Sequence, residues 1–128
     1  MIFRFEAAQS FVEIDFTDEI DGDFAATVRF EVDGFAGTAT CWITGEDVKR
    51  VREQIRAMPG IPVATLRSVS ESEFSLEIKP SSGRGYFAIT TQIADLLRGH
   101  SLSGTIEVET AQIDRFRDYL SKVEKQSK

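Results

Sequence analysis

Residues 35–58, FAGTATCWITGEDVKRVREQIRAM, and residues 102–123, LSGTIEVETAQIDRFRDYLSKV, decide the fold, because the second stretch repeats the pattern of the first. Each begins as a strand that carries a Gly-Thr pair and continues as a helix with four apolar positions. A helix with one apolar stripe must cover a sheet, so the repeat predicts two sheet-covering helices. The stripes are Val48, Val51, Ile55 and Met58, and, 65 positions later, Ile113, Phe116, Leu120 and Val123.

The sequence ahead of the first helix alternates apolar and polar residues with the two-residue period of half-buried strands. It does so over 12–17 and again over 24–32. Asp33-Gly34 then predicts a tight hairpin, because an Asp-Gly pair readily takes the positive φ angles that such a turn needs. This hairpin would place Val32 opposite Phe35, and it would bring the apolar residues of both strands onto one face.

The connection between the first two strands is predicted to be a five-residue loop over 18–22. A two-residue Asp21-Gly22 turn would pair inward residues with outward ones. The longer loop keeps the apolar residues matched, with Phe16 opposite Phe24. The three strands therefore read as a meander.

The second half of the chain repeats this order, with further strands expected near 64–70, 73–80, 85–94 and 100–109. Thr44 is expected to cap a first helix over about 46–58, and Thr110 a second one. We therefore expect an α+β fold in which antiparallel meander sheets of about seven to eight strands and two amphipathic helices form two βββα-like half repeats. These half repeats span about 11–60 and 64–124. Nothing in the composition marks a boundary, so 1–128 is expected to form one domain.

Charge is distributed unevenly along the chain. The net charge is −6, but residues 1–47 hold eleven acidic and two basic residues, and the remainder is slightly basic. An acidic surface repels nucleic acid and attracts a basic protein, so we expect a protein partner with a basic surface and no nucleic acid. The alternative is that the acids only keep a sheet face solvated. No long apolar run and only one cysteine are present, which predicts a cytoplasmic protein that does not associate with a membrane.

Catalytic and metal-binding patterns are weak. Cys41 and His100 are the only thiol and the only imidazole, and Cys41 is expected on the core face as a small apolar residue. The acids near residues 15–23 do not match a calcium loop, because Val28 would occupy the position that needs a bidentate glutamate. We therefore expect no catalytic residue, metal or cofactor, and we do not expect an enzyme.

A partner-binding surface is predicted on the polar face of the first sheet. There a tryptophan would lie among threonines and carboxylates, which is the composition of an interface anchor. The alternative is that the tryptophan packs under a loop or against the N-terminal segment with Phe3 and Phe5. The candidate residues are Glu13, Asp15, Thr38, Thr40 and Trp42.

The chain also resembles the small WapI-type bacterial immunity proteins and related small uncharacterised bacterial domains. The segments that carry this resemblance are 35–43 with the helix behind it, 65–68, 74–78, 85–89, and 102–108 leading to Ile113, Phe116 and Leu120. The resemblance implies a cytoplasmic, non-catalytic α+β protein that neutralises a cognate polymorphic toxin by direct binding, with a toxin domain as the possible basic partner. A homodimer is also possible. The alternative function is a small-ligand-binding domain or an enzyme that uses a pocket between sheet and helix.

Overall fold

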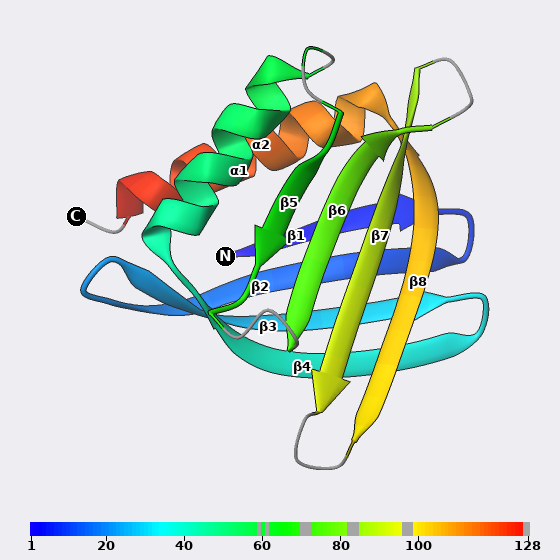
Figure 1. The fold of residues 1–128 in the computed structure, drawn as a ribbon, viewed down its shortest axis with the longest axis horizontal. Helices are drawn as coiled ribbons and strands as arrows, with labels where there is room; N and C mark the ends of the chain where they lie inside the picture. The colour runs from blue at the N-terminus through cyan, green and yellow to red at the C-terminus, as the bar shows by residue number, and fades with distance from the viewer. Residues whose placement is uncertain (59, 61, 70–72, 82–84, 96–98, 127–128) are drawn as a thin grey trace.

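The computed structural model of the chain describes residues 1–128 apart from 59, 61, 70–72, 82–84, 96–98 and 127–128. It contains two four-stranded antiparallel sheets and two helices (Figure 1). Sheet A has the order β1(Ile2–Ala7), β2(Ser10–Ile20), β3(Asp23–Val32), β4(Phe35–Ile43), and is followed by α1(Gly45–Ala57). Sheet B has the order β5(Ala64–Arg67), β6(Phe74–Pro80), β7(Tyr86–Asp95), β8(His100–Glu109), and is followed by α2(Thr110–Gln126). The α+β class with two meander sheets is confirmed.

The two sheets cross face to face (Figure 1). The glycines of the repeated Gly-Thr pairs lie where side chains of the opposite sheet leave no room for a Cβ atom. A Cβ atom on Gly37 of sheet A would lie 2.7 Å from Leu102 Cδ2 and 2.8 Å from Ile93 Cδ1 of sheet B. A Cβ atom on Gly104 of sheet B would lie 2.9 Å from Val32 Cβ of sheet A. A glycine recurs in each sheet because a side chain at that position would clash with side chains of the opposite sheet.

Both helices lie side by side along one flank of the crossed sheets (Figure 1). Their apolar stripes are buried as expected, except that Met58 is only partly buried. Thr44 caps α1, since its hydroxyl accepts the N–H of Asp47 at 3.0 Å. Arg52 of α1 pairs with Glu124 of α2 at 2.7 Å. Among the described residues, neither helix has the length and apolar character needed to cross a membrane.

Each helix closes the outer edge of the sheet that belongs to the other half repeat. Asp47 and Gln54 of α1 accept the main-chain N–H groups of Arg67 and Thr65 on β5, at 2.8 and 3.0 Å. Gln112 of α2 accepts the N–H of Glu6 on β1 at 2.9 Å and donates to the same residue's carbonyl at 2.8 Å. The two halves therefore exchange helices, and they share one buried apolar cluster.

The predicted β2–β3 connection is wrong. The strands continue to a two-residue turn, with Ile20 opposite Asp23 and positive φ angles at Asp21 and Gly22. A two-residue turn was excluded because it would pair inward residues of one strand with outward residues of the other. A bulge at Thr17 adds one residue to β2 and restores the match. Phe16 consequently pairs with Ala26 instead of Phe24.

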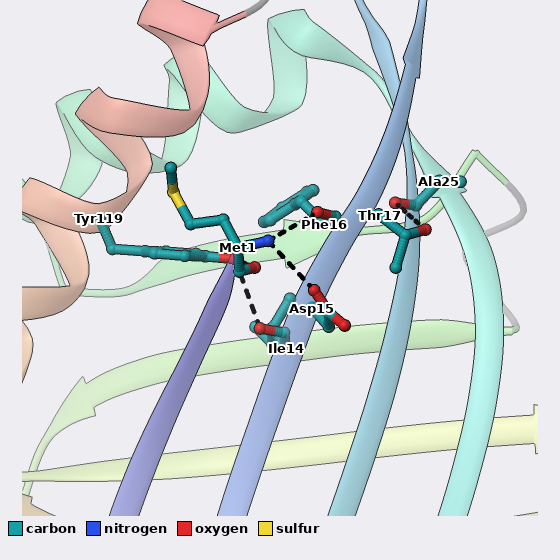
Figure 2. Close-up of polar contacts among 7 residues, drawn as sticks. All are labelled: Met1, Ile14, Asp15, Phe16, Thr17, Ala25 and Tyr119. Carbon is teal, nitrogen blue, oxygen red and sulfur yellow. Dashed lines mark hydrogen bonds and ion pairs between the residues drawn. The ribbon is translucent and has the colours of Figure 1, made fainter.

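The bulge is held by its own side chain, because Thr17 Oγ1 donates to the carbonyl of Ala25 at 3.4 Å (Figure 2). By contrast, the predicted β3–β4 register is confirmed from Val32–Phe35 to Phe24–Ile43.

Two further expectations need correction. The first half repeat has four strands, because β1 pairs with β2 along its whole length. Its apolar residues Phe3 and Phe5 pack on Phe116 of α2, with ring centroids 5.1 and 4.9 Å apart. Thr110 lies inside α2 instead of capping it, since its hydroxyl donates to the carbonyl of Gly85 at 3.1 Å.

Candidate nucleic-acid interface

The predicted site residues lie together on the outward face of sheet A. Strand pairing places Thr40 beside Thr27 and Asp15 in one row, and Thr38 beside Arg29 and Glu13 in the next. The opposite face of the same strands is the buried core. We call this surface the Trp42 face; its members are Arg4, Phe11, Glu13, Asp15, Thr27, Arg29, Thr38, Thr40 and Trp42.

The carboxylates of the Trp42 face are already paired within the chain. Glu13 lies between two arginines, with Arg4 Nη2 at 3.0 Å and Arg29 Nη1 at 3.4 Å. The Asp15 carboxylate receives the amino group of Met1 at 3.3 Å (Figure 2). These acids are therefore not offered to a basic partner as the sequence reading assumed.

The arginines are the outermost charges of their row. The side chain of Glu13 is 12% exposed, whereas those of Arg4 and Arg29 are 39% and 52% exposed. Arg4 also lies over the Phe11 ring, 4.1 Å from its centroid, which fixes its direction. The sequence places Arg29 on this face, but charge counted by segment does not reveal that Arg4 and Arg29 lie outermost over Glu13.

Trp42 is 44% exposed at the end of β4. The alternative that it packs with Phe3 and Phe5 is wrong, since those rings lie against α2 on the other face of sheet A. Trp42 is fixed through its main chain, because its carbonyl accepts the N–H of Val69 at 2.8 Å. The indole is thus held at the sheet margin with part of its surface free for contact.

The bulge brings an acid into the row of the tryptophan, two strands away. Ala25 pairs with Trp42 on one side and with Asp18 on the other, where the sequence reading expected Asp15. Asp18 is exposed and begins an acidic stretch that continues to the Asp21-Gly22 turn. Negative charge therefore lies at the far end of the row that contains Trp42, and the arginine row lies two rows further along the strands.

An open cleft of about 550 Å³ lies at the free margin of β4. Residues 36–40 form one wall; the end of sheet B, including Glu73, Ile93, His100 and Leu102, forms the rest. We call it the edge cleft. Its lining joins β4 to the ends of β7 and β8, and Figure 1 shows β4 crossing these two strands near their lower ends.

Main-chain groups of β4 point into the edge cleft. In an antiparallel strand the N–H and C=O of one residue point to the same side, and the side alternates along the strand. Trp42 directs its carbonyl outward to Val69, so Ala36, Thr38 and Thr40 direct theirs outward as well. Within the part of the chain that the structure describes, none of these three residues has a hydrogen-bond partner on that side.

The thiol and the imidazole do not form a catalytic pair. Cys41 is buried on the core face, and burial, followed by the nearby Glu73 carboxylate, raises the pKa of its thiol to about 12. His100 is exposed at the start of β8. The described residues contain no group of histidine, cysteine and acidic side chains that could hold a metal ion.

Comparisons with known proteins identify the fold. No family model and no curated protein matches the sequence. The structure of the plant transcriptional regulator PBF-2 matches with a TM-score of 0.59 and 9% identity, over 97% of this chain and 80% of that chain. The crystal structure of WHY3 from Arabidopsis thaliana matches with a TM-score of 0.57 and 8% identity, over 96% of this chain and 85% of that chain. At these identities the likeness is one of fold.

This likeness corrects the expected function. A fold shared along nearly the whole chain with a plant transcriptional regulator contradicts an immunity protein that neutralises a toxin by binding a basic surface of the toxin. It also contradicts the expectation that nucleic acid is not a partner. The alternative of a sheet–helix pocket does not fit either, because the hollow beside the end of α2 holds only about 120 Å³, whereas ligand pockets usually exceed about 300 Å³.

Proposed function

We propose that this protein is a non-catalytic nucleic-acid-binding protein and that the Trp42 face is its contact surface. The observation that carries the proposal is the fold shared over 97% of the chain with a plant transcriptional regulator. Regulators of transcription act on nucleic acid, and the Trp42 face supplies the types of group that such a ligand needs. The cytoplasmic location expected from the sequence remains a prediction.

Trp42 indicates an unpaired stretch of nucleic acid. A base can stack on an exposed indole only when its face is free, as it is in single strands, loops and ends. Such stacking is tolerant of base identity, since every base has a π-face. We therefore expect binding to single-stranded DNA or RNA with modest sequence preference.

The charges beside Trp42 indicate the direction in which the strand runs. Phosphates are attracted by Arg29 and Arg4 and repelled by Asp18. The hydroxyl of Thr40 lies in the row between the tryptophan and the arginine row, and that of Thr38 lies within the arginine row beside Arg29. Both can donate to phosphate or base. The nucleic-acid backbone is therefore expected to run from Trp42 across Thr40 toward Arg29.

The test uses fluorescently labelled single-stranded DNA, single-stranded RNA and duplex DNA in anisotropy titrations. Trp42 is the only tryptophan, so quenching of intrinsic fluorescence reports stacking at this residue alone. Trp42→Ala is expected to weaken single-strand binding by about tenfold or more, because stacking contributes about 1–3 kcal/mol per base. Trp42→Phe should retain most of the affinity.

Tyr86→Ala is the matched control, because Tyr86 is also 44% exposed but belongs to the outward face of sheet B. It should leave the affinity unchanged. Absence of binding to every oligonucleotide at low salt would refute the proposed function. Equal effects of Trp42→Ala and Tyr86→Ala would refute the Trp42 face as its site.

A further inference from the structure

The edge cleft exposes main-chain hydrogen-bonding groups of β4 that the proposed function does not use. Helix side chains close the outer edges of β1 and β5, but residues 36–40 of β4 are open along the cleft. This segment, Ala-Gly-Thr-Ala-Thr, contains none of the lysines or prolines with which natural edge strands avoid pairing. Its open main-chain donors and acceptors match those of another extended chain.

The shape of the molecule favours an added strand at this position. The ends of β7 and β8 extend past β4, so sheet A does not cover this end of sheet B (Figure 1). Leu102 is only partly buried there, although it belongs to the core-facing side of sheet B. A strand added beside β4 would continue sheet A over Leu102, and it would bury apolar surface as well as satisfy main-chain groups.

The charges of the cleft favour a peptide over a nucleic acid. Its described lining residues include no lysine or arginine and one acidic side chain, Glu73, so the described part of the lining does not favour phosphate. Glu73 lines the cleft and, among the residues that the structure describes, forms no ion pair. Its carboxylate lies close enough to Cys41 to help raise the pKa of that thiol, which places it near the wall formed by β4. A cationic side chain is the complement of such a site.

We propose that the edge cleft binds an extended peptide segment, which pairs with residues 36–40 as an additional strand of sheet A and directs a lysine or arginine toward Glu73. The segment is about five residues long, because Val69 already occupies the carbonyl of Trp42 and ends the open edge. Its side chains that point toward Gly37 and Ala39 are small or apolar. This binding mode goes beyond the proposed function and uses main-chain groups instead of the Trp42 face.

The test begins with selection of random octapeptides displayed on phage against the full chain, followed by anisotropy titrations with the selected peptide carrying fluorescein. Thr38→Pro removes a cleft-facing N–H without removing a bond to β3, since proline is tolerated at such edge positions. It is expected to weaken peptide binding about tenfold or more. Glu73→Lys should weaken a lysine-containing peptide by a similar factor.

The internal repeat provides the control. Thr105 occupies the equivalent position in the second Gly-Thr pair, on the outer edge of β8 and outside the cleft lining. Thr105→Pro should leave peptide binding within about twofold, because it alters an edge that the peptide does not touch. Trp42→Ala should likewise leave it within about twofold, so failure of this proposal is distinguishable from failure of the proposed function.

Amide hydrogen exchange of the unaltered protein tests the same inference without a variant. The amides of Thr38 and Thr40 should exchange rapidly in the free chain and slow when the selected peptide is added. The proposal is overturned if no selected peptide protects these amides, or if Thr38→Pro and Thr105→Pro weaken binding equally. Protection of these amides by an oligonucleotide, and not by any peptide, would also overturn it and assign the cleft to nucleic acid.

Discussion

Gly37 and Gly104 occupy equivalent positions in the two half repeats, but the atoms opposite them differ. A Cβ on Gly37 would meet the terminal methyl groups of Leu102 and Ile93, which can move by rotation. A Cβ on Gly104 would meet the branched Cβ of Val32, which is fixed to the backbone of β3. The same residue type is therefore under different constraint at the two positions.

We expect Gly104→Ala to lower the free energy of unfolding by about 1–3 kcal/mol, because the sheets would have to separate. Gly37→Ala should lower the free energy of unfolding by a smaller amount, since flexible side chains can move away from the added methyl group. Urea denaturation of both variants checks the order, with Thr38→Ala as a surface control. A larger loss for Gly37→Ala would contradict the sheet-crossing explanation.

Cys41 makes stability depend on pH in the alkaline range. Burial raises the pKa of its thiol from the ordinary 9.0 to about 12 in the folded chain. Above pH 9 the unfolded chain loses this proton while the folded chain keeps it, so the free energy of unfolding falls as pH rises from 9 toward 12. The Cys41 thiol can lower the free energy of unfolding by at most about 1.4 kcal/mol for each pH unit.

Cys41→Ala is expected to flatten the fall in stability between pH 9 and 10, measured by urea denaturation at several pH values. Slopes are compared instead of absolute stabilities, because the substitution also removes buried volume. Burial also raises the pKa of the Tyr119 hydroxyl, so part of the slope should persist at higher pH. An unchanged slope in Cys41→Ala would show that the thiol is not the cause.

At the scale of the element, strand edges are closed by side chains that could not be assigned from sequence. Gln112 makes two hydrogen bonds to Glu6 of β1, although 106 positions separate them. We expect Gln112→Ala to speed exchange of the Glu6 amide and to lower the free energy of unfolding by about 1–2 kcal/mol, about 1 kcal/mol for each hydrogen bond. Gln92→Ala, an exposed glutamine on sheet B, is the control. Unchanged exchange at Glu6 would show that α2 does not close this edge.

Elements were predictable where local chemistry specified them. The Asp33-Gly34 turn fixes the β3–β4 register, because turn geometry and apolar alternation agree there. The β2–β3 register was missed, because the bulge at Thr17 changes the count between two strands and leaves no mark on alternation. The β1 strand was missed because the aromatic rings and side-chain hydrogen bonds that hold its outer edge come from α2, which is distant in sequence.

At the scale of the whole molecule, net charge misled the functional interpretation. The five candidate residues share one side of sheet A, as alternation predicts, and their role in binding stays a prediction. The expected partner was wrong, because a net charge of −6 does not reveal that Glu13 lies beneath Arg4 and Arg29. Pairing between strands that are distant in sequence decides which charge is outermost.

This arrangement predicts weak salt dependence of nucleic-acid binding. Two arginines on the Trp42 face give an expected slope of about −1.4 for log affinity against log salt with a single strand. Anisotropy titrations at several salt concentrations measure it, and Arg29→Gln should reduce the slope by about 0.7. Lys122→Gln on α2, away from this face, should not change it. A slope steeper than about −3 would mean that cations elsewhere carry the binding.

The exchange of helices between the half repeats has a consequence for the gene. If the chain arose by duplication, the ancestral copy had to dimerise, since one half alone would leave its first strand without the helix that closes it. Once fused, neither copy could be lost without exposing the other. A change in one apolar stripe must then be matched in the shared cluster, whereas the two outer faces are free to acquire different ligands.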